Sequence, residues 1–100
     1  MADQSMSSSR SIGTPGEYTN DLYRVYFEVG EHDGFAGQVI AHFLAARMVE
    51  ITGTAFVPES LRRQAHGYEV DIPLQLVPEV VRELSAKNVA VYQVIRINKL

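Results

Sequence analysis

Two different periods of apolar residues alternate along this chain, and their order limits the possible folds more than any other feature. In residues 22–29, β-branched and aromatic residues occupy every second position, which is typical of a half-buried strand. Residues 34–50 instead repeat their apolar positions at helical spacing, and Gln38 and His42 share the opposite face. Asp33 is placed to cap this helix. The chain therefore begins as a strand followed by an amphipathic helix.

Three further strands and a second helix are expected downstream. The predicted strands cover residues 51–57, 68–73 and 89–97. The polar residues 58–66 between the first two predict a loop. Pro78 suits the first turn of the second helix, and Asn88 suits its left-handed C-terminal cap.

The expected order, β-α-β-β-α-β, is that of a ferredoxin-like α+β plait. Right-handed crossovers would close it into one four-stranded antiparallel sheet with both helices on one face. We expect strand 89–97 to pair beside strand 51–57 at the sheet edge, or with a strand of another chain. Residues 1–20, which contain five serines, two glycines and a proline, predict a flexible leader, and residues 21–100 the domain.

Composition narrows the class of protein. An apolar fraction of 46% and a charged fraction of 21% are typical of globular chains. The net charge of −3 argues against nucleic-acid binding, and no apolar run approaches the roughly 20 residues of a membrane span, so no membrane insertion is expected. The chain has no cysteine, which suits a reducing compartment, and we predict a cytoplasmic location.

Catalytic patterns are not recognisable in the sequence. There is no phosphate-binding GxxxxGK[ST] motif and no Ser/His/Asp set with its usual context, so we expect neither nucleotide hydrolysis nor a cofactor. The densest group of possible metal ligands is Glu31, His32 and Asp33, which lies where a polar turn is expected, so no metal site is predicted. A small enzyme that uses His42 or Tyr68 in a cleft between subunits stays an open alternative.

Two surfaces are candidates for binding. Arg62, Arg63 and His66 concentrate cationic groups in one connection, where arginine forks could bind an anionic metabolite or nucleotide. The competing interpretation is a solvated loop, or one in which these groups pair with Glu59 and Glu69. Since a plait covers one side of its sheet, apolar residues on the other side predict a surface for a partner domain or a second copy. That expected interaction surface consists of Leu22, Tyr26, Tyr92 and Val94, with Ala90 beside them.

Two stretches resemble the accessory domain that follows the ATPase core in many bacterial ABC-transporter ATP-binding subunits. The segment GTPGEYTNDLYRVYFEV is similar to the family's entry into its small α+β domain, although Gly16 departs from the pattern. The stretch VVRELSAKNVAVYQVIRI is similar to its closing helix and strand, and the family continues with an acidic-aromatic helix where this chain stops. The resemblance implies a docking or regulatory module beside an ATP-binding neighbour, with no catalytic residues of its own.

Two functions therefore follow as hypotheses. The first is a non-enzymatic regulatory or interaction module that forms a homodimer, or docks on a partner domain, through its open sheet face or edge strand. The second is a sensor of a small anionic ligand at a subunit interface near residues 58–67. The expected fold is also similar to that of ACT and PII-type sensor domains, which bind effectors at subunit interfaces.

Overall fold

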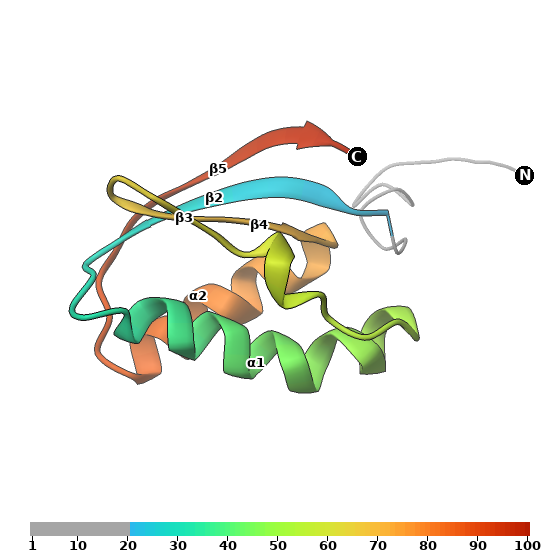
Figure 1. Ribbon diagram of the computed structural model, residues 1–100, viewed down its shortest axis with the longest axis horizontal. Helices are drawn as coiled ribbons and strands as arrows, with labels where there is room; N and C mark the ends of the chain where they lie inside the picture. Colours follow the sequence, from blue (N-terminus) through green and yellow to red (C-terminus); the bar gives the residue numbers. More distant parts are fainter. Residues whose placement is uncertain (1–20) are drawn as a thin grey trace, which may run out of the picture.

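The computed structural model describes residues 21–100, which form one antiparallel sheet with two helices on the same face (Figure 1). The elements follow the order predicted from the sequence, and the ferredoxin-like plait is confirmed. They are β2 (Tyr23–Val29), α1 (Phe35–Thr52), β3 (Arg62–Gln64), β4 (Gly67–Ile72), α2 (Val77–Ala86) and β5 (Val91–Lys99). Short 3-10 turns at Pro58–Ser60 and Leu74–Leu76 precede β3 and α2. The predicted leader, residues 1–20, lies outside the described residues.

The strand order is β3-β4-β2-β5, so β2 and β4 are central and β3 and β5 form the two edges. The predicted strand at 51–57 is wrong, and so is its expected pairing with the closing strand. Met48 and Ile51 extend the apolar stripe of α1, which ends at Thr52 and is capped by Gly53 with φ of 76°. The second strand lies instead within the polar stretch expected to be a loop, and β5 pairs with β2.

The core lies between the sheet and the helices. Alternate residues of β2 point inward, and Val25, Phe27 and Val29 are at most 5% exposed. They pack with the inward residues of β4 and with the apolar faces of α1 and α2; the innermost of these are Val70, Ile72, Ile40, Leu44, Val80 and Leu84. Arg47 of α1 holds Glu79 of α2 through hydrogen bonds of 2.7 and 3.3 Å. The period-two pattern of β2 and β4 and the helical patterns of α1 and α2 thus indicate their buried faces correctly.

Glu31, and not Asp33, caps the start of α1. Gly34 occupies the cap position with φ of 81° and makes no side-chain hydrogen bond, while the Glu31 carboxylate accepts the Ala36 amide at 2.9 Å. Asp33 has φ of 54°, a left-handed conformation within the turn. The expected cap at Asp33 is therefore wrong, because the tight turn moves the cap role to a residue before it.

Two glycines allow close packing near β4. A Cβ on Gly37 would lie 2.7 Å from the Tyr68 ring, so its absence lets that ring rest on the first turns of α1. A Cβ on Gly67 would lie 1.9 Å from the Phe27 carbonyl oxygen of the neighbouring strand. These two positions bring β4 close to α1 and to β2. Within residues 21–100, neither helix has the length and apolar character that crossing a membrane requires.

Candidate functional site

Strand β5 is the least covered element among the described residues. Every residue from Tyr92 to Lys99 is exposed, although four of them are large and apolar in this stretch. Tyr92 is 67% exposed, Ile95 43% and Ile97 46%. One side of β5 pairs with β2, and no described strand pairs with its other side, which we call the free edge. Exposed apolar side chains beside an unpaired strand edge are a template for pairing with another chain.

The pairing register determines which side chains of β5 face the helices. Val94 lies opposite buried Phe27 and Arg96 opposite buried Val25, so both are on the helix-facing side. Ile95 lies opposite Tyr26 and therefore points to the face that neither helix covers. The register shifts between Arg24 and Val25 and again between Glu28 and Val29. Regular pairing is thus confined to the middle of β5, residues 93–96.

The same register fixes the direction of the backbone groups in this window. Val29 donates its amide to His66, while Gly30 donates its amide to Ala90. Along β2, odd-numbered residues therefore bond toward β4 and even-numbered residues toward β5. Because Val94 and Arg96 lie opposite odd-numbered residues of β2, they direct their amide and carbonyl groups to the free edge.

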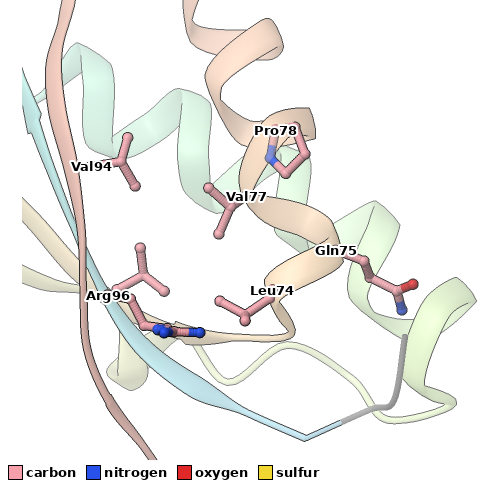
Figure 2. A pocket seen from close by; sticks show the side chains of 7 residues that line it. Leu74, Gln75, Val77, Pro78, Val94 and Arg96 are labelled. Atoms are coloured by element: carbon pink, nitrogen blue, oxygen red, sulfur yellow. The ribbon is translucent and has the colours of Figure 1, made fainter. Parts of the chain in front are cut away.

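A groove of about 520 Å³ lies between β5 and the start of α2. In Figure 2 the side chains of Val94, Val77 and Leu74 converge on this space from the strand and from the helical segment, and Arg96 extends toward Leu74. Its lining, which we call the β5–α2 groove, consists of Val25, Leu74, Gln75, Val77, Pro78, Val94 and Arg96. It combines an apolar wall with one guanidinium group.

Arg96 is held across the inner side of the sheet. Its guanidinium carbon lies 5.6 Å from the centre of the Tyr23 ring, within the range of a cation–π contact. Among residues 21–100, no carboxylate lies within ion-pair distance of this guanidinium. Lys99, two pairs further along, does hold Asp21 at 3.2 Å. The cation in the groove is thus positioned by an aromatic ring and offers its donors to the groove.

The sheet face that neither helix covers carries charged side chains over β2, β3 and β4, beside Tyr26 and Ile95, which lie opposite each other on β2 and β5. Arg24 donates two hydrogen bonds to the Asp71 carboxylate, from Nε at 3.0 Å and from Nη2 at 3.4 Å. Arg62 donates a third to the same carboxylate at 3.1 Å. Arg62 also lies 3.6 Å from Glu69. Partial burial raises the pKa of Asp71, but the hydrogen bonds from the two arginines outweigh it and leave the pKa below its ordinary value. These four side chains form a network across three strands, which we call the face network.

The predicted interaction residues are spread over different surfaces. Leu22 packs against the core and lines a second cavity of about 400 Å³ beside Met48. Tyr26 is half-buried on the face that neither helix covers. Tyr92 is exposed on β5, while Val94 faces the helices, so the expectation that all four share one open face is wrong. The register shift near Tyr92 changes the alternation that the sequence pattern assumed.

The predicted anion-binding residues are close in sequence but point apart. Arg62 and Arg63 are neighbours on β3 and occupy opposite faces of the sheet. Arg62 belongs to the face network, whereas Arg63 lies 3.4 Å from Glu31 and 5.5 Å from the centre of the Tyr68 ring. His66 is exposed in the β3–β4 turn. Both arginines are thus engaged with carboxylates of the same chain.

Glu31 is the centre of a second polar cluster, at the start of α1. Its side chain is only 10% exposed and accepts hydrogen bonds from the Tyr68 hydroxyl and the Ala36 amide, beside Arg63. Burial raises the pKa of Glu31, but these bonds and the arginine charge lower it below the ordinary value. Burial and the adjacent carboxylate raise the pKa of Tyr68. The cluster fastens β3 and β4 to α1.

His32 and Asp33 are both about 90% exposed, and His42 lies on the exposed face of α1. Among residues 21–100, no three histidine or carboxylate side chains come together as metal ligands would. The groove itself escaped prediction because it depends on how α2 lies over β5. The sequence signal available for the groove was the two-residue spacing of Val94 and Arg96, which places both on one face of a strand.

Comparison with known proteins adds no family. No protein-family model matches the chain, and neither a curated protein nor a solved structure matches it. The fold is therefore established by the arrangement of its own strands and helices, and the function has to be inferred from its surface.

Proposed function

We propose that this chain is a non-enzymatic protein-interaction module of regulatory type, which adds the free edge of β5 to a strand of another chain or domain. One observation carries the proposal: β5 is a nine-residue edge strand that directs backbone groups of Val94 and Arg96 outward beside exposed apolar side chains. Strand addition of this kind obtains affinity from main-chain hydrogen bonds and specificity from the side chains alongside.

The state of the other polar groups supports this choice of surface. Asp71, Glu31 and Glu79 each hold an arginine of the same chain, and each has a pKa below its ordinary value. These carboxylates are therefore already occupied by contacts within the chain. The free edge of β5 has backbone donors and acceptors that the described residues leave to solvent. It is therefore the surface that gains most from a partner.

The resemblance to accessory domains of ABC-transporter ATP-binding subunits suggests one kind of partner. In that reading, β5 docks on a neighbouring ATP-binding core or on the accessory domain of a second subunit. A homodimer through the same strand belongs to the same proposal, since it uses the same backbone groups.

Photocrosslinking from the two edges tests the proposal. A photoreactive phenylalanine derivative replaces Tyr92 on β5 in one variant and the exposed Gln64 on β3 in a matched control. After irradiation in the cell that makes the protein, we expect discrete crosslinked products from position 92 and none from position 64. Light scattering of the purified protein then separates self-association from binding to another chain. A monomer that crosslinks at neither position, or only at position 64, contradicts the proposal.

A further inference from the structure

We infer that the strand accepted by β5 carries a carboxylate and an apolar side chain two residues apart, both directed toward the β5–α2 groove. The inference rests on the proposed function and deepens it by specifying the chemistry of the partner. It follows from the positions of two neighbouring features, the outward backbone groups of β5 and the groove with its guanidinium.

The backbone sets the position of the partner strand. Val94 and Arg96 direct their amide and carbonyl groups to the free edge, so two partner residues lie opposite them. Directly opposed residues of paired strands project their side chains on the same face, about 5 Å apart. Both partner side chains therefore project to the helix-facing side, as Val94 and Arg96 do. In the antiparallel arrangement used throughout this sheet, the partner residue opposite Arg96 comes first along the partner chain.

The groove selects the chemistry of those two side chains. The wall of the groove across from Val94 and Arg96 includes Val77 and Leu74, which suits an apolar side chain. Arg96 offers its guanidinium without an ion-pair partner among residues 21–100. A carboxylate opposite Arg96 would gain charge-assisted hydrogen bonds, which are stronger than neutral ones. The preferred partner pattern is thus acidic–any–apolar in the N-to-C direction.

Two other occupants fit less well. A second copy of β5 that pairs Val94 with Arg96 of the partner copy would bring two guanidinium groups onto one face as diagonal neighbours, roughly 7–8 Å apart. A small amphipathic carboxylic acid could fill the groove, but it would leave the backbone groups at the free edge unpaired. An acidic strand satisfies the groove, the guanidinium and the backbone together.

Peptide binding tests the inference. The probe is the acetylated and amidated peptide Lys-Thr-Glu-Val-Ile-Thr-Lys, and the matched control carries Gln in place of Glu. Affinities are measured by calorimetry, and amide resonances and exchange rates by NMR, for the full chain. We expect the Glu peptide to bind about tenfold more tightly than the Gln peptide. The amide protons of Val94 and Arg96 should become protected from exchange.

Variants separate the charge from the backbone. Arg96→Gln should reduce the ratio between the two peptides to about one, because the carboxylate then has no cation to bind. Val94→Pro should weaken both peptides at least about tenfold, since it removes an outward amide while leaving the bonds to β2. If Val94→Pro does not fold, methylation of the peptide nitrogen opposite Val94 removes the other hydrogen bond of the same residue pair, the one donated to the Val94 carbonyl, and tests the same backbone pairing. Val94→Thr keeps the amide and should retain the preference for Glu.

The outcomes distinguish the inference from the proposed function. Equal affinity of both peptides, with protection at Val94 and Arg96, overturns the acidic pattern and leaves strand addition in place. Self-association that Val94→Pro abolishes, with no peptide binding, also overturns the acidic partner while supporting β5 as the interface. No binding and no association by the full chain contradict both.

Discussion

The two edges of this sheet differ in length and in the state of their side chains. β3 has three residues, and its two arginines hold carboxylates on opposite faces of the sheet. β5 has nine residues and exposes Tyr92, Ile95 and Ile97. Short, charged edges resist pairing with other chains, whereas long apolar edges invite it. One fold thus contains a protected edge and an open one.

Even the open edge is limited. Register shifts at both ends of β5 confine regular pairing to residues 93–96. Bulges of this kind increase local twist and interrupt a ladder, which restricts indiscriminate association. The usable window offers the backbone groups of only two residues, Val94 and Arg96. Selectivity then has to come from the side chains beside this window, and the groove supplies them.

The largest expected effect tests how closely β4, the strand that pairs with the protected edge β3, packs against β2. Gly67→Ala should destabilise the protein by about 3 kcal/mol, the upper end of what overpacking costs, because the added Cβ would lie 1.9 Å from the Phe27 carbonyl oxygen. Gly30→Ala, next to β5, is the matched control: its nearest neighbours would lie 3.6 Å away, an ordinary contact, and we expect a change within about 0.5 kcal/mol. Urea unfolding followed by circular dichroism measures both. Similar losses of stability at the two positions would contradict the closer packing at Gly67 than at Gly30.

The face network should give the next largest effect. Asp71→Asn leaves two arginines without their shared carboxylate, and we expect a loss of about 1–2 kcal/mol in the free energy of unfolding. The half-exposed arginines keep the loss moderate, because solvent screens their charge. Lys99→Gln breaks the exposed pair with Asp21 near β5 and should leave the urea midpoint unchanged. A larger loss from Lys99→Gln than from Asp71→Asn would contradict the assignment of the structural ion pairs.

Acidification should lower the free energy of unfolding, because it protonates Asp71 and Glu31, which bind the arginines of β3. The pKa values of Asp71 and Glu31 in the folded protein lie below their ordinary values of 3.8 and 4.5. The unfolded chain therefore takes up protons first, so this stability is complete above those ordinary values and is lost as the pH falls through the lower folded values. Urea midpoints at pH 7 and pH 3 should show the fall, and Asp71→Asn should reduce it. An unchanged midpoint between these pH values would exclude the two carboxylates as stabilising groups.

The sequence pattern predicts the fold where one residue alternation or one helical stripe determines an element. β2, β4 and the buried face of α1 follow from local periodicity. The pattern fails at β3, because this short polar segment of two arginines and a glutamine forms a strand only through its pairing with β4 and the ion pairs of its arginines with Asp71 and Glu31. It also fails for the side of Val94, since a bulge reverses the alternation after Tyr92.

The candidate site was predictable only in part. The expected plait predicts that strand 89–97 lies at an edge of the sheet and that Tyr92 is exposed. The role of Arg96 depends on the distance between β5 and α2 and on the Tyr23 ring beneath the guanidinium, which are properties of packing that no local pattern records. Arg62 and Arg63 illustrate the converse: their sequence proximity suggested one site, but neighbouring strand residues point to opposite faces.

The smallest expected effect distinguishes an exposed surface from part of the core. Ile95 is 43% exposed and points to the face that neither helix covers, so Ile95→Thr keeps a β-branched residue and should change the free energy of unfolding by no more than about 0.5 kcal/mol. The same change removes an apolar cross-strand contact from an added strand, which should weaken binding of the Glu-containing peptide about threefold.

Gln64→Thr on β3 is the control and should alter neither quantity, because that residue is exposed at the protected edge. If Ile95→Thr lowers stability by more than about 2 kcal/mol, the side chain serves the core as a buried apolar residue does. If stability and peptide affinity both stay unchanged, the partner strand does not cover this face. A weaker peptide complex at unchanged stability is the combination that assigns Ile95 to the interface, since only there does its apolar surface become buried after folding is complete.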